Sequence, residues 1–206
     1  MHRAGPRLTV RLEHDFTEAM DDLRRDGWEQ RPPVSARDEF DDDSHHLVVR
    51  LGPRPVAMVR TTIAERSVLV TWSRGGAPLP IGPDVAELTR GVVAAPVRRF
   101  GLYRLAMLET VLRLRALGAR VATAAIEPAF PGRPFLTALG FVPVGDPVLF
   151  DDHPRSRTLA LPLVLNVDAR HEARWDALLS QQLARLLVAG YELDSELPLD
   201  RERALV

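Results

Sequence analysis

The chain has 206 residues, 46% of them hydrophobic, so it can bury one sizeable core and form one domain of ordinary size. Its formal net charge of -1 gives no general attraction to nucleic-acid phosphates or anionic lipid, so nucleic acid is not an expected partner. The absence of cysteine excludes disulfides, thiolate nucleophiles and thiolate zinc sites. With no signal-peptide pattern and no apolar run near the ~18 residues of a membrane span, we expect a cytoplasmic protein.

The first half of the chain predicts mainly strands. Alternating polar and apolar residues predict a strand over 8–12, and a helix follows from Asp15 or Thr17 to Arg25. Residues 27–44 contain two prolines and an acidic run, which predict a loop. A Gly52-Pro53 turn predicts a hairpin. Further strands are expected at residues 46–50, 56–62, 67–72 and 86–94, with a surface connection over 73–83.

The second half alternates between helices and strands. Apolar residues recur at helical spacing over 100–117, Gly118 fits the C-cap of this helix, and Asp168 begins a last helix that stops at Gly190. Between these helices we expect a strand at 121–126, a short helix at 134–139, and a strand pair at 141–150 and 158–167. This order predicts an α/β (α+β) fold: a mixed central sheet of six to seven strands with helices on both faces, plus an extra C-terminal helix. We expect residues 1–167 to form the main domain and residues 168–206, the C-terminal helix and tail, to pack on it.

The stretch between the strand at 86–94 and the long helix has features of an anion site. Pro96 breaks the strand, and Arg98, Arg99 and Gly101 then fall at a helix N-terminus. Unpaired backbone N–H groups and the positive end of the helix dipole favour an anion there, and the arginines add charge. A solvated helix start is the alternative interpretation.

This stretch also resembles the signature loop of the GNAT superfamily of N-acyltransferases, Arg/Gln-x-x-Gly-x-Gly/Ala. The match covers the first four positions and departs at the last, where Tyr103 replaces a small residue. Residues 134–145 are similar to the closing helix, Leu-Gly-Phe turn and strand of that superfamily, and the resemblance extends over about residues 7–166. It implies a GNAT-like sheet and a donor that is acyl-CoA or acyl-phosphopantetheine, with no metal. The donor-binding residues that it implies are Val92, Val93, Arg98, Arg99, Phe100, Gly101, Leu102 and Tyr103.

Within the superfamily, the chain resembles the branch of acyl-homoserine-lactone synthases and N-acyl amino acid synthases. That branch carries a tryptophan, then Asp-x-x-Asp, an arginine ending the third strand, and Glu-x-Ser/Thr-Arg on the fourth. The matching residues here, in the same order, are Trp28, Asp38, Asp41, Arg60, Glu87, Thr89 and Arg90. They are implied to contact substrate or to hold the structure together.

Strand geometry adds a separate expectation for the Glu87–Arg90 segment. A period of two places Glu87, Thr89 and Gly91 on one face of the strand and Arg90 on the other. A buried guanidinium needs an anionic partner, which Asp38 or Asp41 could supply. Two interpretations of Arg90 and these aspartates remain open: a structural ion pair that fixes the 27–44 loop, or a contact with substrate.

The implied chemistry is attack of an amine on a thioester carbonyl. Because a protonated amine is not a nucleophile, a carboxylate or a water that it holds must accept a proton, and Glu87 is the candidate base. The alternative is a strand-edge carboxylate without a catalytic role. Backbone N–H groups near Val92 and Val93 would stabilise the oxyanion. Residues 127–139 hold no tyrosine for the general acid that many relatives use, and Tyr103 is not assigned that role.

Three functional interpretations remain open. The first is an N-acyltransferase that uses acyl-CoA or an acyl carrier protein and acts on a small-molecule amine, such as an amino acid. The second is an ordinary acetyl-CoA-dependent acetyltransferase of a small molecule or protein amine, and the third is a catalytically degenerate domain that binds a thioester or a partner. Arginines that could meet an acidic carrier are Arg98, Arg99, Arg104, Arg113 and Arg115. The last helix could cover an acyl pocket or form a homodimer surface.

Overall fold

The structure, a computed structural model, describes residues 5–27, 37–63, 79–153 and 156–195. The strands are β1 (Arg7–Glu13), β2 (His45–Leu51), β3 (Arg54–Ile63), β4 (Val85–Val93), β5 (Val121–Ile126), β6 (Val142–Pro143), β7 (Val148–His153), β8 (Ser156–Asn166) and β9 (Glu192–Ser195). The helices are α1 (Glu18–Gly27), η1 (Ala95–Phe100), α3 (Leu102–Arg113), α4 (Arg133–Leu139), η2 (Ala169–His171) and α5 (Glu172–Val188).

The strands form one mixed sheet in which the parallel pair β4–β5 lies near the middle. The order is β6-β8-β5-β4-β3-β2-β1-β9, and β7 pairs with β8 beside β6. Strands β1 to β4 are antiparallel neighbours, and β9 adds to the edge of β1 in parallel. The chain crosses from β4 to β5 through η1 and α3, so the segment that leaves β4 lies at the centre of the sheet.

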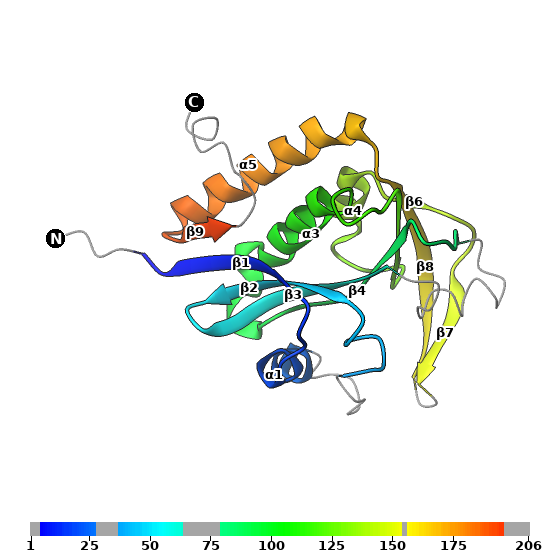
Figure 1. Cartoon of the computed structure of the whole chain (residues 1–206), viewed down its shortest axis with the longest axis horizontal. Coiled ribbons are helices and arrows are strands. Elements are labelled where there is room, and N and C mark those ends of the chain that lie inside the picture. The colour runs from blue at the N-terminus through cyan, green and yellow to red at the C-terminus, as the bar shows by residue number, and fades with distance from the viewer. Residues whose placement is uncertain (1–4, 28–36, 64–78, 154–155, 196–206) are drawn as a thin grey trace.

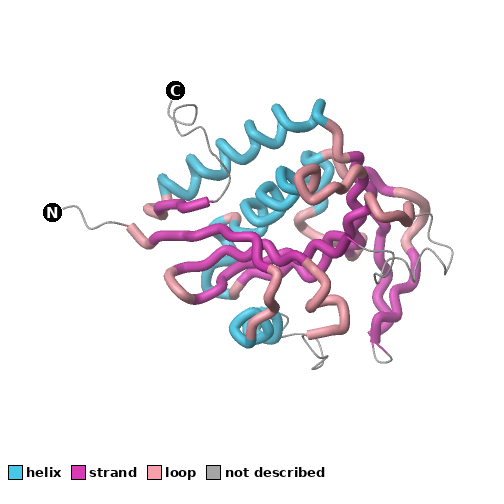
Figure 2. The backbone as a smooth tube through the Cα atoms, in the orientation of Figure 1, coloured by secondary structure: helices cyan, strands magenta, loops and turns pink. Residues whose placement is uncertain are grey.

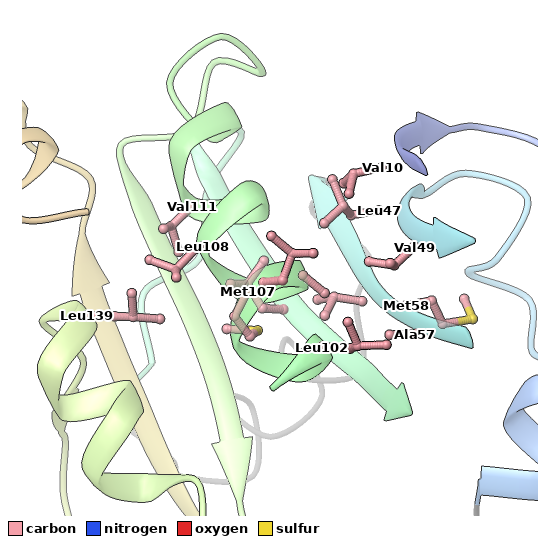
Figure 3. Close-up of a cluster of buried hydrophobic side chains, with 14 of the residues drawn as sticks. Val10, Leu47, Val49, Ala57, Met58, Leu102, Met107, Leu108, Val111 and Leu139 are labelled. Carbon is pink, nitrogen blue, oxygen red and sulfur yellow. The ribbon is translucent and has the colours of Figure 1, made fainter. Parts of the chain in front are cut away.

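Helices cover both faces of the sheet (Figures 1 and 2). Helix α1 lies on one face, and α3 and α5 lie on the other, with α3 between the sheet and α5. The core forms where α3 meets β1 to β3 (Figure 3), and its members are buried: Val10, Leu47, Val49, Ala57, Leu102, Met107, Leu108 and Val111. Burial of a side chain of this size stabilises a fold by about 1.5–3 kcal/mol.

The C-terminal segment packs on the same core. Trp175 of α5 is 1% exposed, and its indole N–H donates to the Leu139 carbonyl oxygen at 2.8 Å, which joins α5 to the end of α4. Gln182 of α5 donates from Nε2 to the Phe100 carbonyl oxygen at 3.2 Å. At the chain's far end, the Ser195 hydroxyl of β9 donates to Glu109 Oε1 of α3 at 3.0 Å. Helix α5 and β9 therefore brace the turn that precedes α3 and the helix itself.

The predicted fold class is confirmed, and two details differ. The described residues contain nine strands instead of six to seven, because β9 adds an edge strand and the strand expected over 141–150 is divided into β6 and β7. The division follows from Gly145, which has φ +77°, and from Pro147, which cannot donate to a strand ladder. The long helix begins at Leu102, since residues 95–100 form the 3-10 helix η1. The strand expected over 67–72 lies outside the described residues.

Candidate functional site

The fourth strand carries a bulge at the centre of the sheet. Its pairing with β3 shifts register between Met58 and Arg60, and Arg90 opposite this point has φ +54°. Pairing with β5 ends at Leu88 and Ala124, whereas β4 continues to Val93. Residues 89–93 are therefore an open edge of β4, with no strand partner on the β5 side among the described residues. Their backbone polar groups on that side can bind an extended ligand.

The turn after the open edge is shaped by a glycine. Gly101 has φ +74°, and a Cβ there would lie 2.6 Å from Gln182 Nε2, so a side chain at 101 would be strained and would clash. No side chain caps the N-terminus of α3. The first amides of that helix are therefore available to an anion at this turn.

The two arginines of the turn are both exposed. Arg98 donates from Nε to the Val93 carbonyl oxygen at 3.3 Å and from Nη2 to the Gly27 carbonyl oxygen at 2.9 Å. It thus connects the end of β4 to the end of α1, a structural role beside the predicted phosphate contact. Phe100 is 40% exposed and contacts the Tyr191 ring edge-on, with centroids 5.4 Å apart.

Tyr103 lies beside the open edge of β4. A Cβ on Gly91 would come within 2.9 Å of the tyrosine's Cε2 atom, so the ring occupies the space that the glycine leaves. On its other side the ring meets Phe130, in the loop between β5 and α4, with centroids 5.8 Å apart. Burial raises the pKa of the Tyr103 hydroxyl above its ordinary value. The ring therefore reaches from β4 to the segment that follows β5.

Below the bulge, five charged residues form an acid–arginine cluster: Arg24, Asp38, Asp41, Arg60 and Arg90. Arg24 holds Asp41 through two hydrogen bonds of 2.7 Å, one to each carboxylate oxygen. Arg60 donates from Nη1 to Asp38 and, at 3.1 Å, to Asp41. Arg90 donates to Asp38 Oδ2 at 2.7 Å. The cluster thereby fixes the segment after residue 37 to α1, β3 and β4.

Burial controls the ionisation of this cluster. Burial alone would raise the pKa of Asp41, but the hydrogen bond and charge of Arg24 outweigh it and hold that pKa below its ordinary value. Burial lowers the pKa of Arg24. His46 is fully buried, its Nε2–H donates to the Asp41 carbonyl oxygen at 2.9 Å, and burial lowers its pKa. His46 is therefore neutral at pH 7.

Glu87 lies on the same face of the sheet as the cluster. Glu87 is 2% exposed, and it pairs across the sheet with Thr62 of β3. The Thr62 hydroxyl lies 2.7 Å from the hydroxyl of Ser44, which follows Asp38 and Asp41 in the chain. Two positions along β4, Thr89 accepts a hydrogen bond from Arg60 Nε at 3.1 Å. Glu87, the candidate base, thus lies two residues before the β4 residue that contacts Arg60 of the cluster.

The bulge corrects one sequence-based expectation. Strict alternation of side chains along β4 predicts Thr89 and Arg90 on opposite faces of the sheet. It therefore also predicts Glu87 and Arg90 on opposite faces. In the structure both Thr89 and Arg90 contact the acid–arginine cluster, because the positive φ at Arg90 interrupts the alternation. The prediction of opposite faces is therefore wrong. Arg90 does have one of the two carboxylate partners that the sequence predicts, Asp38.

Sequence reasoning missed Arg24 and His46, and Trp28 lies outside the described residues. Arg24 follows Met20 by four positions and so falls on the buried stripe of α1, which is the signal that could have found it. His46 sits in a β-branched strand pattern, where a histidine gives no such signal. Arg113, expected at a carrier surface, is instead 8% exposed and paired with Glu109 within α3, so that expectation is wrong.

The described residues were also compared with the requirements of a metal site and of a membrane span. Within the part of the chain that the structure describes, no group of three or more histidine, aspartate or glutamate side chains is arranged to hold a metal ion. Among the same residues, no helix is long and apolar enough to cross a membrane.

Comparison of the structure with solved structures identifies the fold. The acyl-homoserine lactone synthase BjaI, solved with SAM and isopentyl-CoA, is 18% identical with a TM-score of 0.63, and the match covers 97% of this chain and 99% of BjaI. The synthase LasI is 15% identical with a TM-score of 0.62, covering 83% of this chain and 95% of LasI. A GNAT-family structure from Desulfovibrio desulfuricans is 18% identical with a TM-score of 0.57, covering 78% and 99%.

The chain therefore has the fold of the GNAT N-acyltransferases, as its sequence motifs predict. Its structural neighbours include several acyl-homoserine lactone synthases. These belong to the branch that the motif residues between Asp38 and Arg90 resemble. By sequence, the chain matches neither a family model nor a curated protein.

Proposed function

We propose that the chain is an N-acyltransferase that moves an acyl group from a thioester donor to the amine of a small molecule, an amino acid being the acceptor class that the sequence favours. The observation that carries this proposal is the open edge of β4, residues 89–93, which lies between Glu87 on one side and the Gly101 turn on the other.

The open edge suits the donor. The phosphopantetheine arm of coenzyme A or of an acyl carrier protein is extended and carries amide groups, which can bind along the edge of β4 that β5 does not cover. Its phosphate would meet the first amides of α3 and Arg98, and the thioester would lie near Val92 and Val93. Backbone N–H groups there would stabilise the oxyanion of the tetrahedral intermediate.

Glu87 supplies the proton acceptor in this proposal. The acceptor amine loses a proton to Glu87, directly or through one water, as its nitrogen forms a bond to the thioester carbonyl carbon. The carbon–sulfur bond then breaks, and the sulfur leaves with the electron pair. The resulting thiolate takes a proton from solvent and Glu87 returns the amine's proton to solvent, so an amide and a free thiol result.

The acid–arginine cluster supports positioning of the acceptor site. Arg24, Asp41 and Arg60 are at most 1% exposed, so their role is to hold the bulge and the loop in place. The side chains of Arg90 and Asp38 are 16% and 20% exposed and form the part of the cluster that an acceptor can reach. This arrangement combines the structural and the substrate-binding interpretations of these residues.

Two observations favour a carrier-protein or long-chain donor over acetyl-CoA. Tyr103 stands where a small residue would leave room for a diphosphate to pack on the helix. Arg98, Arg99 and Arg104 are exposed around the same turn and can steer an acidic carrier to it.

Tyr103 is also the observation that favours the alternative interpretation, in which the domain binds a thioester but does not catalyse acyl transfer. If its ring blocks the open edge, a donor would bind weakly and no acyl transfer would follow. The intact Gly101 turn and the buried Glu87 argue for catalysis.

A thiol-release assay tests the proposal. Purified protein is mixed with matched acetyl, medium-chain and long-chain thioesters on coenzyme A and on a carrier protein, with and without a set of amino acids. We expect thiol release that depends on the amine, is faster from the carrier and slows as salt is raised. A preference for acetyl-CoA that ignores salt would favour the ordinary acetyltransferase. No amine-dependent release from any donor would contradict the proposal.

A further inference from the structure

Helix α5 carries one amide side chain on its buried face. Four of the five buried residues of this helix, Trp175, Leu179, Leu183 and Leu186, provide apolar packing. The fifth is Gln182, which is 4% exposed. Burying an amide costs free energy unless its polar atoms are hydrogen-bonded. An apolar residue would fill the same position without that cost, so packing alone does not account for Gln182.

The amide of Gln182 contacts two consecutive residues of the Gly101 turn. Its Nε2 donates to the Phe100 carbonyl oxygen at 3.2 Å. Its Nε2 and Oε1 also lie 2.6 Å and 3.0 Å from the point that a Cβ on Gly101 would occupy. The amide therefore fills the volume that the glycine leaves, on the side of the turn that faces α5.

The residue after the end of α5 holds the side chain of Phe100 as well. The Phe100 ring meets the Tyr191 ring edge-on, with centroids 5.4 Å apart, and Tyr191 is 9% exposed. The Tyr191 backbone N–H donates to the Leu186 carbonyl oxygen at 2.9 Å, which fixes this tyrosine to α5. Residue 100 is thus held at its carbonyl by Gln182 and at its ring by Tyr191.

The direction of the Phe100 carbonyl matters for an anion at the start of α3. A phosphate there is favoured by the amide N–H groups of the first turn and repelled by any carbonyl oxygen that points at it. Gly101 has φ +74°, and glycine adopts other φ values at little cost, so the peptide that joins Phe100 to Gly101 could rotate. The hydrogen bond from Gln182 opposes that rotation, because it holds the carbonyl oxygen toward α5.

We propose that Gln182 is a positioning residue for the donor phosphate: by holding the Phe100 carbonyl toward α5, it keeps the first amides of α3 open to the anion. This inference rests on the proposed function. It gives α5 a part in donor binding, although this helix lies outside residues 7–166, over which the sequence resembles the superfamily. The C-terminal helix then shapes the donor site from below.

Two substitutions test this role. Gln182→Met and Gln182→Leu both fill the buried position with apolar side chains of different shape, and neither can donate a hydrogen bond. Gln181→Met is the matched control, because Gln181 is the neighbouring residue of α5 and is exposed. Calorimetry with phosphopantetheine measures binding, and a thermal melt shows that each variant folds. We expect both Gln182 variants to raise the dissociation constant about 3- to 10-fold, the range for one lost hydrogen bond, and Gln181→Met to bind like the wild type.

A second readout separates positioning of the phosphate from a general disturbance of the fold. The kcat/KM of each protein is measured with two acyl thioesters that differ only in the phosphate, acyl-phosphopantetheine and acyl-pantetheine. With the phosphorylated donor, the Gln182 variants should lose the same factor in kcat/KM as in binding, through a higher donor KM at unchanged kcat. With acyl-pantetheine they should match the wild type, because that donor has no phosphate for the turn to hold.

Wild-type affinity for phosphopantetheine in both Gln182 variants, or equal losses with the two acyl donors, would overturn the role of Gln182 while leaving the proposed function intact. The same holds if wild-type protein transfers acyl groups without binding phosphopantetheine. If wild-type protein and Gln181→Met both fail to transfer an acyl group from any donor, the proposed function is wrong and the inference fails with it.

Discussion

Arg24 and Asp41 form an ion pair in which both side chains are 0% exposed and two hydrogen bonds of 2.7 Å join the guanidinium to the carboxylate. Asp41 also accepts from the Asp38 backbone N–H at 2.9 Å and from Arg60. Desolvating two charges costs several kcal/mol per ion, so such a pair is tolerated only with further hydrogen bonds of this kind. It fixes helix α1 and the segment after residue 37 against the bulge of β4.

Replacing Asp41 by asparagine should destabilise the protein severely. The change removes the carboxylate that Arg24 holds, while Arg60 keeps Asp38. Breaking a buried pair in this way typically costs 3–5 kcal/mol, a large part of the roughly 5–15 kcal/mol that stabilises a domain. Urea unfolding measures the loss. Asp42→Asn is the matched control, because Asp42 is 66% exposed and forms an ion pair with the exposed Arg37, and it should change the free energy of unfolding by less than about 0.5 kcal/mol. Equal effects of the two substitutions would contradict the role given to the buried pair.

The stability of the protein should fall as the pH drops below about 6.5. His46 has a pKa below its ordinary value because it is buried, so the unfolded chain binds a proton there at a higher pH than the folded chain does. Unfolding is therefore favoured from about pH 6.5 down to the pKa of the folded state. Asp41, whose pKa is lowered, adds its own loss only below about pH 4.

The variant His46→Gln should reduce that first loss, since its amide can still donate to the Asp41 carbonyl but does not titrate. His45, whose pKa is lowered by burial and by the nearby His14, contributes the rest of the loss. Urea unfolding of wild-type protein and variant at pH 8 and pH 5 measures the difference. A variant whose stability falls with pH as steeply as that of the wild type would show that His46 is not the group responsible.

The requirement for glycine at 101 can be separated from ordinary backbone strain. Gly101 and Gly118 both have positive φ, +74° and +86°, but a Cβ at 118 meets nothing within 4 Å. Gly118→Ala should cost about 1–2 kcal/mol, the usual cost of a left-handed residue with a side chain. Gly101→Ala should cost more because its Cβ strikes Gln182. In a Gln182→Ala protein, which has already lost the hydrogen bond to Phe100, the same change at Gly101 should cost only as much as Gly118→Ala does. Thermal melts of these variants and of Gln182→Ala measure the losses, and equal losses for the two glycines in the wild-type background would exclude the clash.

The sequence predicts those parts of the fold that depend on local pattern. The hairpin at Gly52-Pro53 is confirmed, with β2 and β3 on either side and Gly52 at φ +59°. Alternation and turn residues determine such elements through neighbours in the chain. By contrast, β9 has only four residues and is held by β1, far away in sequence, so its own pattern gives no signal.

The candidate site is predictable to a similar extent. A buried guanidinium must have an anionic partner, so the pairing of Arg90 with an aspartate follows from its place on a strand. The bulge does not follow, because one extra residue in a strand leaves the period of two intact on either side. The position of Tyr103 is likewise set by Gly91 on another element, a contact that no spacing along the chain records.

Arg98→Ala should weaken donor binding while leaving the fold intact. A charge-assisted hydrogen bond to a phosphate is worth about 1.5–3 kcal/mol, so the dissociation constant should rise roughly 10- to 150-fold. Calorimetry with coenzyme A and with phosphopantetheine measures it. Arg185→Ala, on the exposed face of α5, is the control. If Arg98→Ala binds both ligands like the wild type, Arg98 serves only its backbone contacts to Val93 and Gly27.

Glu87→Gln should lower turnover by roughly 100-fold or more, because the amide keeps the shape of the side chain but cannot accept a proton. The loss should be greatest at low pH, where the acceptor amine is protonated. Glu18→Gln, at the exposed start of α1, is the matched control and should retain full activity. Steady-state rates measured across pH decide the matter, and a Glu87→Gln rate within a factor of two of the wild type would exclude Glu87 as the base.

The central claim is that this chain forms an amide from a thioester and an amine. The most direct measurement is mass spectrometry of the products when wild-type protein is incubated with an isotope-labelled acyl thioester and a mixture of amino acids, beside the same incubation without protein. The account predicts a labelled N-acyl amino acid that forms only with protein and carries the mass of the intact acyl group. Free labelled acid alone, or no difference from the incubation without protein, would contradict it.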